Sequence, residues 1–185
     1  MIWGKIIYKI YSFLNNLRPN RSVVSAPTAT PKSILRDDLM FWEKELEFAE
    51  VYWKASSRCG PGPKDRYYIL KELLLSLDHL DADTAECGVY KGLGSYIICY
   101  YAGKLKRWPG YMHHMFDSFE GLSIAGPEDI PEPNVRPWRA GDMSCSATEV
   151  EANLAEYSGK IIHTGWIPSC FRNASFGGVW TIVCF

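Results

Sequence analysis

The sequence has no excess of charge of either sign, since 20 Lys and Arg residues stand against 21 Asp and Glu residues. Nucleic acid normally demands a basic patch, so we do not expect it as the main ligand. The sequence also has no internal repeat and no low-complexity tract. Because 47% of its 185 residues are hydrophobic, the chain can instead bury one sizeable core, as a globular domain does.

Motifs for disulfides and for metals are absent too. The six cysteines form no C-x-x-C pair and are irregularly spaced, which predicts reduced thiols in a cytoplasmic protein. His113 and His114 are adjacent, so on a strand they would face opposite sides of a sheet and could not bind the same metal ion. His79 and His163 stand alone. The histidines therefore predict no metal site.

Near its N-terminus the sequence lacks the run of about 20 apolar residues that a membrane span needs. Residues 1–18 are instead predicted to form an amphipathic helix that packs on the domain or on a second subunit of a homo-oligomer, with contact to a membrane surface as the alternative. Three prolines in residues 19–33 are typical of a linker. The helix prediction rests on apolar positions spaced by three and four residues: Trp3, Ile7, Ile10, Leu14 and Leu17.

The body of the protein, residues 34–185, opens with two predicted helices. Apolar positions from Leu35 to Trp53 advance by three or four residues, which predicts one amphipathic helix of about five turns. The Cys59–Pro63 segment must end this helix, because it contains two glycines and two prolines. A second helix then starts at Pro63, and its predicted apolar face consists of Ile69, Leu70, Leu73, Leu74, Leu77 and Leu80.

Strands and helices alternate in the rest of the body. A long loop is expected over residues 121–146, which contain four prolines, and a capping box at Ser146–Glu149 starts the helix that follows the loop. This alternation predicts an α/β fold with a mainly parallel sheet of about four strands and helices on both faces. The other predicted elements are strand 83–89, helix 95–106, strand 112–117, strand 160–165 and strand 179–185.

A glycine-rich turn joins the first strand to the next helix, in the pattern Glu86-x-Gly88-x-x-x-Gly92-x-Gly94. Glycine lets the backbone bend sharply and lets a ligand approach it, while the free N–H groups at a helix start favour a carboxylate, a phosphate or hydroxyl oxygens. The spacing differs from the G-x-G-x-x-G fingerprint, which disfavours NAD and FAD. A plain tight turn without a ligand is the alternative.

Asp117 adds an acidic side chain at the end of the second strand, 23 residues after Gly94 (117 − 94). In a doubly wound sheet, an acidic residue in this place can accept hydrogen bonds from both hydroxyls of a ribose. The glycine turn and Asp117 together predict an adenosine-type cofactor. The alternative role for Asp117 is a cap of the turn in Asp117–Gly121.

Two segments carry a more specific signal: Ala-Glu-Cys-Gly-Val-Tyr-Lys-Gly at 85–92 and Phe-Asp-Ser-Phe-Glu-Gly-Leu at 116–122. Together with residues 146–154 and 164–168, they resemble the macrocin O-methyltransferase family. These are class I enzymes, dependent on S-adenosylmethionine (SAM), that methylate sugar hydroxyls of natural products. The resemblance runs from about Tyr67 to Pro168 and implies a Rossmann-like class I methyltransferase sheet with SAM as cofactor.

The resemblance also implies which part of SAM each site residue would contact. For Trp166, a core aromatic that follows a strand is an equal alternative to a contact with the purine. The implied positions are Glu86 and Gly88 beneath the methionine part, Asp117 on the ribose, Ser118 in the same pocket, and Gly165 and Trp166 beside the adenine, with Gly92 and Gly94 completing the glycine turn.

In this family a divalent metal, such as magnesium, is held by aspartates of an Asp-x-Asp-Leu-Tyr-like segment that begins in the fourth strand. Residues 179–185 contain no aspartate, and none follows Asp142. We therefore expect an incomplete, C-terminally truncated methyltransferase domain without metal ligands and without an assignable catalytic residue. Two functions stay open. One is an O-methyltransferase acting on a hydroxyl of a sugar or other small molecule, whose activity the missing aspartates put in doubt; the other is a non-catalytic fragment that binds an adenosine-type ligand or a partner chain.

Overall fold

A computed structural model describes residues 40–105, 110–126, 129, 138–174 and 180–184. The helix predicted over residues 1–18 and the linker predicted over 19–33 lie outside the described residues. The elements are α2 (Phe41–Lys44), α3 (Leu46–Cys59), α4 (Lys64–Ser76), β1 (Asp83–Cys87), α5 (Leu93–Lys104), β2 (His113–Asp117), α6 (Ala147–Asn153), β3 (Lys160–Thr164), the 3-10 helix η1 (Ser169–Asn173) and β4 (Trp180–Cys184).

The four strands form one parallel sheet in the order β3-β2-β1-β4. Glu86 on β1 pairs with Met115 on β2 and with Val183 on β4. The chain therefore runs outward from β1 through β2 to β3 and then returns to the other side of β1. This order confirms the predicted α/β class and the four-stranded, Rossmann-like parallel sheet. It also creates a switch point beside β1, where ligands of such sheets bind.

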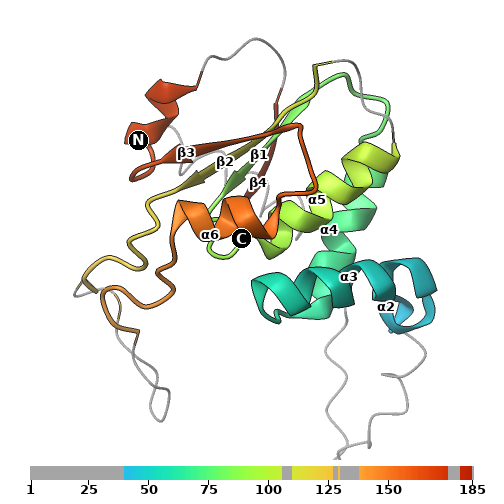
Figure 1. Cartoon of the computed structure of the whole chain (residues 1–185), viewed down its shortest axis with the longest axis horizontal. Helices are drawn as coiled ribbons and strands as arrows, with labels where there is room; N and C mark the ends of the chain where they lie inside the picture. Colours follow the sequence, from blue (N-terminus) through green and yellow to red (C-terminus); the bar gives the residue numbers. More distant parts are fainter. Residues whose placement is uncertain (1–39, 106–109, 127–128, 130–137, 175–179, 185) are drawn as a thin grey trace, which may run out of the picture. The chain divides into compact units, whose positions relative to one another are not determined.

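The main core lies between the sheet and the α-helices, which Figure 1 shows grouped below the sheet in that view. Both crossovers, β1 to β2 and β2 to β3, advance in the same direction, so right-handed connections place α5 and α6 on one face. On the other face, a smaller cluster of Ala85, Phe116, Cys170 and Ala174 lies under η1. We predicted helices on both faces of the sheet. Among the described residues, the second face is covered by the 3-10 helix η1 and by no α-helix.

The prediction of one helix from Leu35 to Trp53 is wrong where the structure describes it. The chain leaves the helical conformation at Glu45, whose φ and ψ are −88° and 101°, and α3 starts anew at Leu46. Two residues of the predicted stripe then face solvent in α3, since Leu46 is 83% exposed and Trp53 is 72% exposed. The stripe that α3 buries instead has the same spacing and consists of Phe48, Val51, Ala55 and Cys59.

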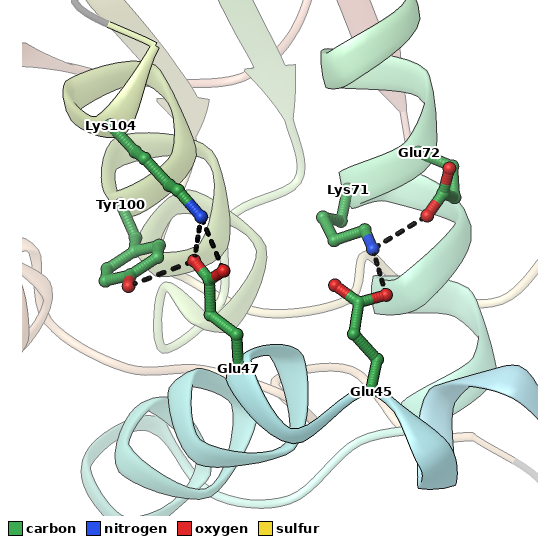
Figure 2. A network of polar contacts seen from close by, with 6 residues as sticks. All are labelled: Glu45, Glu47, Lys71, Glu72, Tyr100 and Lys104. Carbon is green, nitrogen blue, oxygen red and sulfur yellow. Dashed lines mark hydrogen bonds and ion pairs between the residues drawn. The ribbon is translucent and has the colours of Figure 1, made fainter.

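Ion pairs at the start of α3 explain this shift. Lys71 of α4 is only 2% exposed, and its ammonium group binds the carboxylate of Glu45 and lies 2.7 Å from Glu72 (Figure 2). Glu47, two residues further on, binds Lys104 of α5 and accepts a hydrogen bond of 3.3 Å from the Tyr100 hydroxyl. These contacts fix the break at Glu45 and turn the Phe48 stripe toward α4 and α5.

The apolar face predicted for α4 is confirmed in part. Leu70 and Leu74 are buried, whereas Ile69 is 56% exposed and Leu73 is 53% exposed, because the inner face of the helix also contains Lys71. Lys71 enters the core together with its partners, and its ammonium group lies 4.3 Å from the centre of the Tyr68 ring. The buried face of α4 therefore includes a lysine with charged partners, whereas the sequence pattern predicted an entirely apolar face.

Several smaller predictions can be compared directly with the structure. Ser146 caps α6 as predicted, since its hydroxyl accepts a hydrogen bond of 3.0 Å from the Glu149 N–H. Five cysteines are free thiols, as predicted: Cys59, Cys87, Cys99, Cys145 and Cys170. Within the described part of the chain, no helix has both the length and the apolar character to cross a bilayer.

Candidate functional site

A cavity of about 640 Å³ opens at the carboxyl ends of β1, β2 and β3. Its walls come from the loops that follow these strands and from the segment between α3 and α4. The volume falls in the range of small-molecule sites, which is about 300–1,000 Å³. The cavity also lies at the switch point beside β1, so both its size and its place in the fold identify it as the candidate ligand site.

The turn between β1 and α5 requires two left-handed glycines. Gly88 and Gly92 both have a φ of +86°, a conformation that a side chain with a Cβ rarely adopts. The Gly88 N–H donates to the Phe116 carbonyl at 2.9 Å, which extends the β1–β2 ladder by one bond into the turn. Helix α5 then begins at Leu93, two residues before the predicted start, so its first N–H groups lie next to the pocket wall at Gly94.

Asp117 holds this turn through three backbone N–H groups. Its Oδ2 accepts from Val89 at 2.7 Å and from Tyr90 at 2.8 Å, and its Oδ1 accepts from Phe119 at 2.8 Å. The bond from Phe119 is the capping role within Asp117–Gly121 that the sequence left as the alternative, whereas the two bonds from the glycine turn were not predicted. A carboxylate has about four lone-pair sites, so one site on Oδ1 still has room for a ligand hydroxyl. Three of these sites are used, so about one remains for a ligand, which is fewer than two ribose hydroxyls would use.

Six of the eight predicted site residues line the cavity. Gly92 and Gly165 support the wall from behind. A Cβ on Gly92 would lie 3.3 Å from Val150 of α6, and the Gly165 N–H donates to the Asp117 carbonyl at 2.9 Å. The residues that line the cavity are Glu86, Gly88, Gly94, Asp117, Ser118 and Trp166.

Trp166 lies on the rim of the cavity. It is 46% exposed, so the alternative of a core aromatic is wrong. Its indole N–H donates to the Glu120 carboxylate at 3.0 Å, which ties the loop after β3 to the loop after β2. An exposed ring held at its edge by a hydrogen bond leaves its faces available for stacking.

The sequence did not predict the wall between α3 and α4. The Cys59–Pro63 segment and Tyr67 line the cavity opposite the glycine turn. Gly62 makes this approach close, since a Cβ there would lie 2.7 Å from the Tyr67 ring. The Tyr52 hydroxyl holds the segment by donating to the Gly62 carbonyl. The available signal was the Gly-Pro-Gly-Pro run itself, which we interpreted only as a helix breaker.

The loop predicted over residues 121–146 contributes the last part of the wall. Leu122 and Met143 line the cavity from the two ends of this loop. Those ends are joined by two hydrogen bonds of 2.9 Å, from the Leu122 N–H to the Asp142 carbonyl and from the Gly141 N–H to the Leu122 carbonyl. The described ends of the loop thus form part of the cavity wall.

Two ionisable groups of the cavity wall, a thiol and a phenol, are protonated at neutral pH, and burial raises both of their pKa values further. Burial raises the pKa of the Cys59 thiol to about 12 and raises the pKa of the Tyr67 phenol to about 12. Neither group is an anion at neutral pH, so neither can act there as a general base. The described residues also contain no group of three or more His, Cys, Asp or Glu side chains arranged to hold a metal ion.

No family model and no curated protein matches this chain. Among solved structures, the crystal structure of CalS11, a calicheamicin methyltransferase, is similar at a TM-score of 0.43 and 12% sequence identity. The similarity covers 65% of this chain and 58% of that chain, so this chain spans less than two thirds of that structure. We therefore argue function from the residues of the cavity.

Proposed function

We propose that this chain binds SAM in the cavity beside β1 and is related by function to SAM-dependent O-methyltransferases. The observation that carries the proposal is the glycine turn after β1, which is held by an acidic residue at the end of β2 beside the switch point of the sheet. This arrangement suits a ligand with a ribose and polar groups at both of its ends. The resemblance of residues 85–92 and 116–122 to the macrocin family supports SAM as that ligand.

In this proposal each residue has a stated task. Glu86 and Gly88 bind the amino-acid end of the cofactor, the free lone pair of Asp117 accepts from a ribose hydroxyl, and Trp166 stacks on the purine. When bound, SAM supplies a methyl group on a positively charged sulfur. The N–H groups of the glycine turn and the buried walls then orient the ligand and keep water away.

The methyl acceptor is proposed to be a hydroxyl of a sugar or another small molecule. Methyl transfer to a hydroxyl needs the acceptor oxygen in line with the methyl group and a route for its proton. Cys59 and Tyr67 are protonated at neutral pH and supply no such route. The second candidate function, binding of SAM or an adenosine-type ligand without methyl transfer, is favoured by these two cavity groups, because neither can accept a proton at neutral pH.

Isothermal titration of the purified 185-residue chain tests the proposal. We expect saturable heat with SAM and with S-adenosylhomocysteine, and none with NAD. Binding of NAD without binding of SAM would overturn the proposal. A methyl-transfer assay with sugar acceptors and magnesium then separates the two candidate functions, since turnover excludes the non-catalytic one.

A further inference from the structure

We propose that His113 is a positioning residue for Glu86, because its ring N–H turns one carboxylate oxygen inward and leaves the other oxygen for a cationic group of the ligand. His113 is fully buried and Glu86 is 2% exposed. Within the described residues, the Nε2 atom of His113 has no hydrogen-bond partner at normal distance, yet it lies 3.6 Å from Oε2 of Glu86. A buried polar atom so near a carboxylate calls for a physical explanation.

The other side of the His113 ring determines where its proton lies. Nδ1 is 2.9 Å from the Thr84 hydroxyl, and that hydroxyl is 2.6 Å from the hydroxyl of Tyr111. If Tyr111 donates to Thr84 and Thr84 donates to Nδ1, the ring carries its proton on Nε2, pointing at Glu86. The opposite tautomer would place a lone pair of Nε2 against a carboxylate oxygen inside the protein, which is repulsive. We therefore assign the proton to Nε2.

This assignment gives the two oxygens of Glu86 different tasks. The Ser95 hydroxyl donates to Oε2, the same oxygen that faces His113. Oε1 is then left for the cavity, which Glu86 lines. A buried carboxylate that presents one oxygen to a cavity favours a positively charged ligand group, because an unpaired buried charge is costly. The amino group of the methionine part of SAM has this charge, so this part of the inference rests on the proposed function.

The adjacent residue provides a matched control. His114 faces the other side of the sheet, where its Nδ1 lies 2.9 Å from Nε2 of His163. His113→Leu removes the N–H that faces Glu86, whereas His113→Gln can place an amide N–H in nearly the same position. His114→Gln alters a buried histidine of the same strand without touching Glu86.

Titration of the variants with two ligands tests the inference. SAM carries the amino group, and methylthioadenosine carries the adenosine part without it. We expect His113→Leu to weaken SAM binding by about tenfold, because Glu86 loses the N–H dipole that faces it and is no longer held for the amino group of the ligand, and to leave methylthioadenosine binding unchanged. His113→Gln and His114→Gln should each retain SAM binding. An equal loss for both ligands in His113→Leu would make the role of His113 merely structural and would overturn the inference.

Imidazole nitrogen NMR of the unliganded wild-type chain gives a second, independent result. We expect His113 to carry its proton on Nε2 and its Nε2 resonance to shift in Glu86→Gln. A proton on Nδ1 would overturn the inference even if SAM binds. If the wild-type chain binds neither ligand, the proposed function fails, while the NMR result still decides whether His113 positions Glu86.

Discussion

Carboxylates serve different purposes in two regions of this molecule. At the carboxyl edge of the sheet, Asp117 accepts from three backbone N–H groups and so fixes the main chain that lines the cavity. In the helical layer, Glu45 binds the ammonium group of Lys71 and so fixes the packing of α3 against α4 (Figure 2). Substitutions at the sheet edge should therefore change ligand binding as well as stability. Substitutions of the Glu45–Lys71 pair, which does not line the cavity, should change stability far more than ligand binding.

Asp117→Ala is expected to have the largest effect. It leaves the N–H groups of Val89, Tyr90 and Phe119 without their acceptor. The free energy of unfolding should therefore fall by about 2–4 kcal/mol, as expected for hydrogen bonds to a charged group. SAM affinity should fall by more than about tenfold, because the glycine turn loses its support and the ribose loses an acceptor. Urea unfolding and titration calorimetry measure the two effects. Loss of affinity with unchanged stability would show that Asp117 serves the ligand alone and would end the comparison.

Lys71→Ala should test the other region. It removes a buried side chain and leaves the Glu45 carboxylate without its cation, so we expect a loss of about 2–3 kcal/mol in the free energy of unfolding. Lys71→Met keeps the apolar part of the side chain and should lose less. SAM affinity should stay within about twofold of the wild type in both variants, because neither Lys71 nor Glu45 lines the cavity. A fall in affinity that matches Asp117→Ala would show that the two regions are coupled.

The same contrast explains what could be predicted from the sequence. The glycine turn and Asp117 lie on consecutive strands of a parallel sheet, so strand order alone brings them to one edge. The wall at Gly62 and Tyr67 could not be predicted this way, because it depends on how α3 and α4 pack on α5. In α3, two stripes of equal spacing compete, and the ion pair of Lys71 with Glu45 lies outside any periodic pattern. The strands and the glycine turn could therefore be predicted from local sequence patterns, whereas helical periodicity failed in α3, where a tertiary contact decides between two stripes.

His114 and His163 lie together on the face of the sheet opposite Glu86, and they differ from the carboxylates above because burial favours their neutral form. Burial lowers the pKa of both His114 and His163, and the nearness of His163 lowers the pKa of His114 further, against the opposing effect of Asp83 at 3.7 Å. Their unfolded-state pKa of about 6.5 lies above the folded-state pKa, so the unfolded chain takes up protons first. Stability should thus be complete above about pH 6.5 and fall as the pH decreases toward the lowered folded-state pKa.

His163→Phe should reduce that pH dependence. The ring of His163 lies 4.5 Å from the ring of Phe116, centre to centre, so an aromatic replacement keeps the stack. Urea unfolding between pH 5 and pH 8 should then show a shallower slope than the wild type has. His79→Phe is the control, because His79 belongs neither to the His114–His163 pair nor to the Phe116–His163 pair. An unchanged slope in His163→Phe would assign the acid sensitivity to other groups.

Lys104→Ala should have the smallest effect, although Lys104 binds Glu47 in the same layer in which Lys71 binds Glu45. Lys104 is 51% exposed at its side chain and Lys71 is 2% exposed, so water replaces the lost partner of Glu47 and the cost should stay below about 1 kcal/mol. The Lys104 hydrogen bond holds the pKa of Glu47 below its ordinary value, and this stabilisation is present at neutral pH and lost as the pH falls through the lowered pKa. In Lys104→Ala, an NMR titration should therefore show the pKa of Glu47 rising toward its ordinary value. A cost equal to that of Lys71→Ala would mean that burial does not decide the strength of these pairs.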